Sequence, residues 1–307
     1  MTGAGITPPH DPRRMTPTPT ADTGATASEP KRSRAGRNLP AAIASAVLLL
    51  AAIAVSLASF DGFPFVVLAA AAMAVAIWEF RGALAHRDIV LPHEPLHVGS
   101  VAMLLAAWVG GAPALAAGLA VTALAVLLWR LRFGVEGYVR DATAGVFLAV
   151  YLPFLAGFVV LLVRSDDGVW RVITFILVTI ASDIGGYAAG VTLGKHPMAP
   201  VISPKKSWEG FAGSAVSCMV VGWATVTWLL DGRWWVGILL GVLTVVAATL
   251  GDLCESVIKR DLGIKDMSQI VPGHGGLMDR LDSLLATVAP IWLLLYYLVE
   301  TSPTAGL

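Results

Sequence analysis

The stretch ATAGVFLAVYLPFLAGFVVLLV, residues 142–163, runs for 22 residues without a charged side chain. About 20 consecutive apolar residues are enough for a helix to cross the hydrocarbon core of a bilayer. An uninterrupted run of this length is more typical of a membrane span than of a helix in a soluble core. The stretch therefore predicts a transmembrane helix.

Similar apolar runs occur along most of the chain and predict nine spans in all. The other eight are residues 40–60, 64–81, 97–111, 113–130, 169–192, 211–230, 234–252 and 283–299. The third and fourth spans are separated by only a short junction, Gly110, Gly111, Ala112 and Pro113. They form either one long kinked helix or a tight hairpin. We expect an all-α, polytopic membrane protein with about nine transmembrane helices, formed by residues 40–307.

The composition agrees with this prediction. Of the 307 residues, 56% are hydrophobic and 14% are charged, whereas soluble domains carry about 25% charged residues. The 21 basic and 21 acidic residues cancel, so no net charge favours nucleic acid as a partner. Two cysteines, Cys218 and Cys254, are too few for a disulfide framework or a four-cysteine zinc site.

Residues 1–39 are rich in Pro, Thr, Ser and Ala and contain no long apolar run, so we expect a disordered tail. Basic residues gather in alternate loops, at Arg81 and Arg87, at Arg130, Arg132 and Arg140, at Lys195, Lys205 and Lys206, and at Lys259, Arg260, Lys265 and Arg280. Cytoplasmic loops of membrane proteins carry this excess. The pattern predicts that the tail is cytoplasmic and that the basic loops lie on the inner side.

Residues 251–282 contain ten of the chain's charged residues. If the preceding span continues as a helix, Asp252, Glu255, Ser256 and Lys259 share one face. Asp279 and Asp282 share a face at the start of the last span. Carboxylates so placed repel one another unless a cation neutralises them, and an all-oxygen ligand set favours magnesium. The alternative is a set of ion pairs with Lys259, Arg260 and Arg280.

Two inner segments are typical of phosphate binding. In Pro272-Gly273-His274-Gly275-Gly276, the glycines allow close approach of backbone N–H groups to phosphate oxygens. In residues 203–210, Lys205 and Lys206 lie between the hydroxyls of Ser203 and Ser207, and adjacent lysines with hydroxyls suit a polyphosphate. The alternatives are a plain helix-start loop and the general excess of cytoplasmic lysine.

Asp183 follows Ser182 within the sixth predicted span. An aspartate at the centre of a transmembrane helix costs about 2.5–3.5 kcal/mol on insertion scales, so such residues are usually functional. It shares a face with Gly186 and Gly190. We interpret Asp183 as part of the site, with a helix-packing hydrogen bond as the alternative.

Two further patterns match motifs only in their letters. His93-Glu94-Pro95-Leu96-His97 fits a zinc motif that needs both histidines on one helical face, and we expect Pro92 and Pro95 to prevent a continuous helix there. Gly190–Lys195 is one residue too short for a phosphate-binding loop. The four-residue spacing of Gly186, Gly190 and Gly194 instead predicts close helix packing.

Together, Ser256-x-x-Lys259-Arg260-x4-Lys265-Asp266 and Pro272-x-His274-Gly275-Gly276-x-x-Asp279-Arg280-x-Asp282 resemble the signature of the phosphatidate cytidylyltransferases. The segment from Ser203 to Gly210, including Glu209, is similar to a second motif of that family, with Ser207 where Thr is more usual. Ser182-Asp183 resembles a third. The resemblance covers the chain from about residue 140 to the end.

The resemblance implies magnesium-dependent transfer of CMP from CTP to phosphatidic acid in the bilayer, at the cytoplasmic side of the plasma membrane. It implies catalytic roles for Asp252, Lys259, Lys265, Asp279 and Asp282, and metal ligands among Asp252, Asp279 and Asp282, supported by Asp183 and Glu255. The implied substrate-binding residues are Ser203, Lys205, Lys206, Ser207, Glu209, Arg260, His274, Gly275, Gly276 and Arg280. Two points stay open: whether a monovalent cation shares the acidic cluster, and whether two copies form a homodimer.

Two other functions fit the sequence less well. One is a CTP-dependent kinase or cytidylyltransferase that acts on another lipid, such as a polyprenol. The other is an ion or solute transporter that uses Asp183 and the acidic segment for coupling. Transport sites lie near the midplane of the membrane, whereas the phosphate-binding motifs gather at the inner side.

Overall fold

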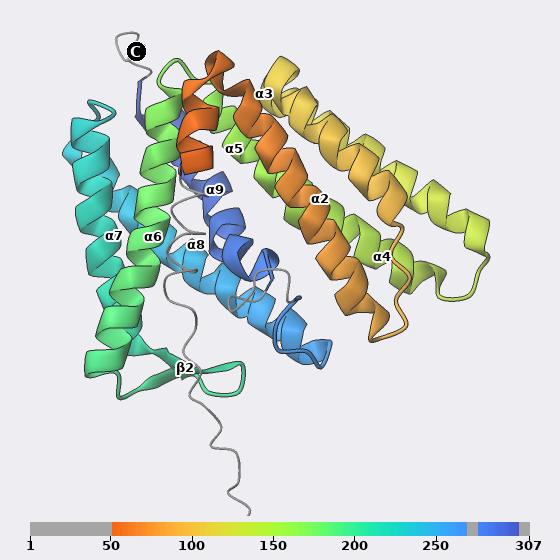
Figure 1. Ribbon diagram of the computed structural model, residues 1–307. Coiled ribbons are helices and arrows are strands. Elements are labelled where there is room, and N and C mark those ends of the chain that lie inside the picture. The colour runs from red at the N-terminus through yellow and green to blue at the C-terminus, as the bar shows by residue number, and fades with distance from the viewer. Residues whose placement is uncertain (1–50, 269–275, 301–307) are drawn as a thin grey trace, which may run out of the picture. The chain divides into compact units, whose positions relative to one another are not determined.

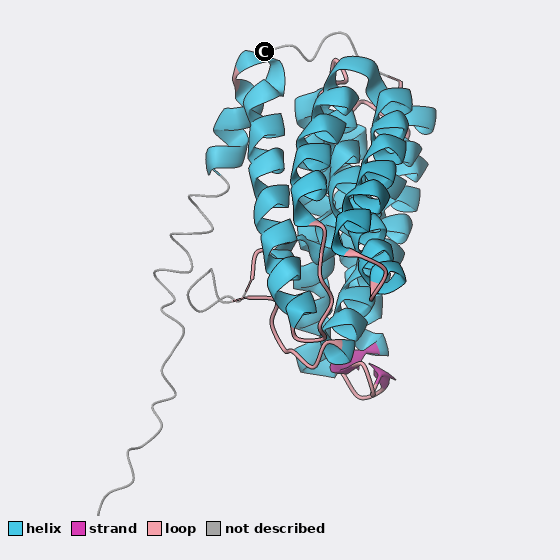
Figure 2. Ribbon diagram, turned by 90° about the vertical axis from the view of Figure 1, so that its right-hand side faces the viewer, coloured by secondary structure: helices cyan, strands magenta, loops and turns pink. Residues whose placement is uncertain are grey.

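The computed structural model describes residues 51–268 and 276–300, which are predominantly helical (Figure 1; Figure 2). The chain divides into two units, residues 1–37 and 38–307, and every described residue belongs to the second. The predicted disordered tail, residues 1–39, lies outside the described residues.

Eight helices and one small sheet make up the labelled elements. The helices are α2 (Phe63–Ala85), α3 (His93–Arg130), α4 (Tyr138–Ala149), α5 (Leu155–Val163), α6 (Gly168–Leu193), α7 (Trp208–Trp228), α8 (Trp234–Asp261) and α9 (Met278–Leu298). Strands β1 (Pro197–Ala199) and β2 (Ser203–Ser207) pair antiparallel between α6 and α7. A π-turn, Val150–Phe154, joins α4 to α5, and short 3-10 turns precede α2 and follow α3.

Among the described residues, seven helical segments are long and apolar enough to cross a membrane. This confirms the all-α, polytopic class. The segment Tyr138–Val163 contains the 22-residue run and joins α4, the π-turn and α5 into one span. Of the first predicted span only residues 51–60 are described, and residues 51–58 are helical.

Helix α3 is a hairpin rather than a straight rod. A Cβ atom placed on Gly99 would lie 2.3 Å from the Thr122 side chain, and one on Gly118 would lie 3.0 Å from Met103. In a straight helix each of these pairs would be more than about 20 Å apart. The chain reverses at Gly111, where φ is +70° and only glycine is unstrained. The third and fourth predicted spans are therefore the antiparallel arms of a tight hairpin.

The prediction that prolines prevent a helix through His93 and His97 is wrong. Helix α3 begins at His93, so Pro95 falls in its first turn, where the backbone N–H groups have no intrahelical acceptor and proline is tolerated. The His97 Nδ1 atom lies 2.7 Å from the His93 carbonyl oxygen. No group of three His, Cys, Asp or Glu side chains suited to a metal occurs within residues 51–268 and 276–300.

Small residues bring α6 and α7 into close contact, as the glycine spacing predicts. A Cβ on Gly186 would lie 2.5 Å from the Ser214 hydroxyl, and one on Gly185 would lie 2.7 Å from the Gly213 carbonyl oxygen. Such contacts are typical of helix packing in membranes, where van der Waals contact replaces the hydrophobic effect. The interpretation of this stripe as a packing surface is confirmed.

The two strands lie at one end of the helical bundle, below α6 and α7 and next to the C-terminal half of α8 (Figure 1). The C-terminal end of α2 and the start of α9 are turned toward the same end. These are the ends that carry Arg81, Lys205, Lys206 and Lys259. Three of the four basic segments predicted to lie on one side of the membrane therefore gather at one end of the bundle.

A buried ion pair joins the second arm of α3 to α4. Arg130 is 4% exposed, and its guanidinium lies 2.9 Å from the Asp141 carboxylate, which is fully buried. Arg130 also donates to the carbonyl oxygens of Gly134 and Glu136, at 3.2 and 2.6 Å. The loop between the two helices is thereby fixed by a single side chain.

A second buried acid links α2 to the start of α9. Glu79 is 1% exposed, and its carboxylate accepts hydrogen bonds from the Ser268 hydroxyl and from the N–H groups of Leu277 and Met278, at 2.5, 2.8 and 2.7 Å. The first N–H groups of a helix have no intrahelical acceptor. Glu79 supplies that acceptor from a neighbouring helix and fixes where α9 begins.

Replacing Asp141 with Asn should lower the free energy of unfolding by about 3–5 kcal/mol, because the Arg130 charge is then buried without its counter-ion. Thermal unfolding of the purified protein in detergent measures this loss. Arg140 contacts the same carboxylate but is 49% exposed, so Arg140→Gln should cost less than about 1 kcal/mol. Equal losses in the two variants would contradict the buried-pair interpretation.

Replacing Glu79 with Ala should loosen the start of α9, because three donors lose their acceptor at a cost of about 1–3 kcal/mol each. Hydrogen exchange at the amides of Leu277 and Met278 should become faster, with a smaller effect in Glu79→Gln, whose amide oxygen still accepts. Glu94→Gln is the control, since Glu94 is a half-exposed acid at the start of α3. Unchanged exchange in Glu79→Ala would rule out the capping role.

Candidate functional site

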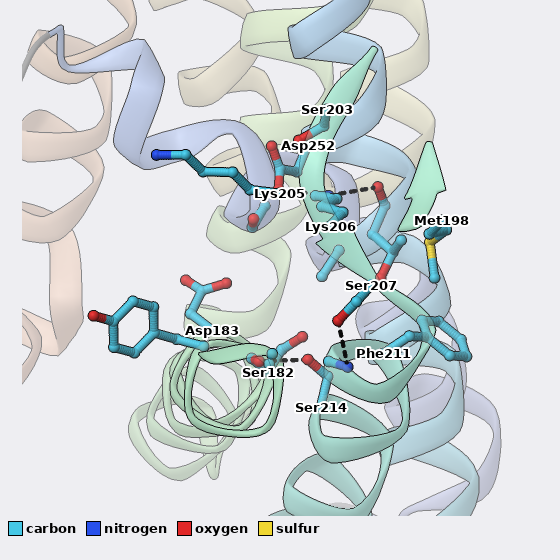
Figure 3. A pocket seen from close by; sticks show the side chains of 17 residues that line it. Ser182, Asp183, Met198, Ser203, Lys205, Lys206, Ser207, Phe211, Ser214 and Asp252 are labelled. Atoms are coloured by element: carbon cyan, nitrogen blue, oxygen red, sulfur yellow. Dashed lines mark hydrogen bonds and ion pairs between the residues drawn. The ribbon is translucent and has the colours of Figure 1, made fainter. Parts of the chain in front are cut away.

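A polar cavity of about 320 Å³ lies between α6, β2, α7 and α8 (Figure 3). Helix α6 contributes Ser182 and Asp183, and α8 contributes Thr249 and Asp252. Besides Tyr187 of α6, the remaining hydroxyl and ammonium groups come from β2, α7 and α9, namely Ser203, Lys205, Lys206, Ser207, Ser214 and Ser283. The structure therefore brings together three segments that the sequence singles out: Ser182-Asp183, the lysine pair and Asp252.

The two lysines of β2 have different surroundings. The Lys206 ammonium lies 2.5 Å from the Asp252 carboxylate and 3.4 Å from the Thr249 carbonyl oxygen, so it is held against α8. Lys205 precedes it on the strand and is exposed. Asp183 points from α6 toward the space that Lys205 and Asp252 border (Figure 3). An anion entering this space would meet the held ammonium group of Lys206 and the exposed one of Lys205.

Ser207 ends β2 and begins α7. Its backbone is extended, with φ −124° and ψ 157°, and its hydroxyl accepts a hydrogen bond from the Gly210 N–H at 3.1 Å. This is the geometry of a helix N-cap, for which Ser is among the preferred residues. The cap fixes the strand relative to α7, and with it the positions of Lys205 and Lys206.

Lys259 occupies the centre of a second cluster, two turns beyond Asp252 along α8. Its ammonium lies 2.9 Å from Glu255 and 2.8 Å from Asp279. The other oxygen of Asp279 accepts hydrogen bonds from the N–H groups of Gly276 and Met267, at 2.8 and 3.2 Å. Helix α8 continues beyond the predicted span, 234–252, to Asp261, so the condition for Asp252, Glu255 and Lys259 to share one face is met. Glu255 and Asp279 therefore form ion pairs with Lys259, which is the alternative to a cation site that the sequence left open.

The carboxylates near these clusters form a donor set that suits a hard cation. Glu255 is fully buried, and its Oε1 atom has no hydrogen-bond partner among the described residues. The carboxyl groups of Glu255 and Asp282 interact, and Asp282 interacts electrostatically with Asp252 and Asp183. In the described ranges these acids do not converge as three ligands on one point. The donor chemistry fits magnesium, and the orphaned Glu255 oxygen is where an extra positive charge would be stabilised.

The other predicted site residues lie apart from the polar cavity. Glu209 accepts hydrogen bonds from the N–H groups of Lys195 and His196 and pairs with the His196 ring at 2.5 Å, so it anchors the turn before β1. Arg260, Lys265 and Arg280 are exposed and do not line the cavity. His274 and Gly275 lie outside the described residues.

Sequence reasoning misses two residues that the structure brings to the Lys259 cluster. Glu79 caps α9, which carries Asp279 and Asp282. Tyr151, in the π-turn, has a buried hydroxyl without a hydrogen-bond partner among the described residues, and it interacts electrostatically with Glu255 and Asp282. A lone carboxylate in an apolar span is a signal that could have identified Glu79. For Tyr151, the signal is Pro153, two residues later in a span that continues as helix, because such a proline can mark a π-turn.

Comparison with known proteins identifies the family of this chain. A model of the cytidylyltransferase family matches residues 40–298. A phosphatidate cytidylyltransferase of Mycobacterium leprae is 43% identical over 278 residues, which cover 85% of this chain and 89% of that protein. Another, from Mycobacterium bovis, is 41% identical over 298 residues, 90% of this chain and 97% of that protein. With the match extending over nearly all the spans, the chain belongs to the cytidylyltransferase family.

Proposed function

We propose that this protein transfers CMP from CTP to phosphatidic acid and produces CDP-diacylglycerol and pyrophosphate. The observation that carries the proposal is the polar cavity, in which Lys205, Lys206 and several hydroxyls face two carboxylates at one end of an apolar bundle. Family membership and the names of the relatives support this reaction. A site at the end of the bundle is accessible to a soluble nucleotide and to a lipid.

The chemistry needs charge neutralisation more than a general base. A phosphate oxygen of phosphatidic acid, already ionised near neutral pH, attacks the α-phosphorus of CTP. The bond from that phosphorus to the oxygen bridging the β-phosphate breaks, and pyrophosphate leaves with the electron pair. Two anions must therefore be held in line against their repulsion, which is a matter of positioning and electrostatics.

The residues of the polar cavity and of the Lys259 cluster fit that task. Lys205 and Lys206 would bind CTP phosphates, with Ser203 and Ser207 as neighbouring hydroxyl donors. Lys259, held between Glu255 and Asp279, would stabilise charge beside them. Asp252, Asp279 and Asp282, with Asp183 and Glu255, would hold magnesium, which when bound neutralises phosphate oxygens.

We place this site on the cytoplasmic side of the plasma membrane. The basic ends of α2 and α8 and the lysines of β2 gather at one end of the bundle, and basic loops favour the cytoplasm. CTP is a cytoplasmic solute, so this orientation gives both substrates access to the same end of the protein.

Purified protein with CTP and phosphatidic acid should form CDP-diacylglycerol only when a divalent cation is present, and chelation should abolish the product. The label from α-labelled CTP should appear in the lipid. Transfer of the γ-label instead would identify a kinase, and substrate flux in sealed vesicles without CTP would identify a transporter. Absence of labelled lipid at every magnesium concentration would disprove the proposed reaction.

Replacing Lys206 with Gln should lower kcat/KM by about 10²-fold or more, because a charged donor to the nucleotide phosphates is lost and Asp252 becomes unpaired. Lys195→Gln is the matched control, since Lys195 is an exposed lysine of the same inter-helix segment that does not line the cavity. Its activity should stay within about twofold of wild type. Equal losses would show that general surface charge, not the cavity, sets the rate.

A further inference from the structure

A second cavity, of about 660 Å³, lies between the C-terminal end of α2, the following loop and the start of α3, and we call it the α2–α3 cavity. Its lining includes Trp78, Arg81 and Gly82 from α2 and His93 from α3. Its volume is within the usual range of small-molecule sites. The polar cavity shares none of these residues.

The α2–α3 cavity is connected to the Lys259 cluster through residues of its wall. Met267 and Ser268 line it. The Met267 N–H donates to Asp279, which pairs with Lys259, and the Ser268 hydroxyl donates to Glu79. On the other side, Asp252 of the polar cavity lies two turns before Lys259 on α8. The wall of the α2–α3 cavity is therefore hydrogen-bonded to the Lys259 cluster through Met267, and the polar cavity is connected to it along α8.

The chemistry of the α2–α3 cavity suits an amphipathic anion. Arg81 makes no hydrogen bond or ion pair with any other residue in the part of the chain that the structure describes. Helix α3 begins in the cavity, and its first N–H groups add to the positive potential. The Glu94 carboxylate of its first turn also lines the cavity and lies 3.3 Å from the His93 ring. Arg130 also lines the cavity but is already committed to Asp141.

Apolar side chains lie beside these positive groups. Trp78 and Phe133 line the α2–α3 cavity, yet they are 55% and 59% exposed. Leu91 and Pro92 form a buried part of its wall. Exposed aromatic side chains at the ends of membrane helices are typical of the headgroup region of a bilayer. A ligand here would have its charge near Arg81 and its apolar part against aromatic and aliphatic side chains.

We propose that the α2–α3 cavity binds the phosphate-monoester headgroup of the lipid acceptor, with Arg81 as the main cationic contact. The proposal rests on the proposed function, because a reaction between a nucleotide and a lipid needs two places of different polarity beside one reaction centre. The polar cavity then receives the nucleotide phosphates. The lipid phosphate approaches the Lys259 cluster from the side of α2.

Gly82 allows a direct test, because a Cβ atom added there meets nothing within 4 Å although the residue lines the cavity. Gly82→Phe places a large side chain at the cavity wall, and Gly82→Ala adds only a methyl group while also raising helix propensity. We expect Gly82→Phe and Arg81→Gln each to raise the KM for short-chain phosphatidic acid at least tenfold, with the KM for CTP within twofold of wild type. The KM of Gly82→Ala for the lipid should rise less than that of Gly82→Phe, because a methyl group fills less of the cavity.

Arg132→Gln is the charge control, since Arg132 is an exposed arginine stacked on Trp129 that does not line either cavity. Binding without turnover is measured by native mass spectrometry of the full-length protein with dioleoyl phosphatidic acid, dioleoyl phosphatidylcholine or inorganic phosphate. We expect retention of phosphatidic acid by wild type and its loss in Gly82→Phe. Unchanged lipid KM and unchanged retention in both cavity variants would overturn the proposal, whereas retention without any CDP-diacylglycerol synthesis would overturn only the proposed reaction.

Discussion

The ion pairs of Lys259 hold the functional end of this protein together. One ammonium group lies between Glu255 of its own helix and Asp279 of α9, and the second oxygen of Asp279 accepts the N–H groups of Gly276 and Met267. These groups are partly or fully buried, and breaking such a pair leaves a costly uncompensated charge. The end of α8, the start of α9 and the backbone at Met267 and Gly276 therefore keep one relative position.

The apolar spans contain few charged residues, and the packing of the spans determines where those residues lie. Small residues allow α6 to pack closely on α7, which sets Ser182 and Asp183 opposite the lysines of β2. The Ser207 cap fixes the strand, and Lys206 joins it to Asp252 on α8. Each of these contacts is local. Together they form a polar cavity at one end of a bundle whose surface elsewhere is mostly apolar.

Much of this could be predicted from the sequence, because the signals involved are local. Apolar runs identify the helices, and the spacing of Asp252, Glu255 and Lys259 identifies one face of α8. Contacts between distant segments could not be predicted in this way. Glu79 meets its partners about 190 residues later in the chain, and no spacing rule relates them. The error over His93 and His97 came from applying the rule for proline in a helix interior to a helix start, where it does not hold.

The capping of α9 by Glu79 has a consequence for biogenesis. Helix α2 is synthesised long before α9, so the Glu79 carboxylate enters the membrane without the donors that satisfy it in the finished protein. Burying an unpaired carboxylate is costly, and this cost is fully relieved only when Ser268 and the start of α9 have been synthesised. A chain that ends before α9 therefore lacks Asp279 of the Lys259 cluster and also leaves the Glu79 carboxylate without its backbone donors.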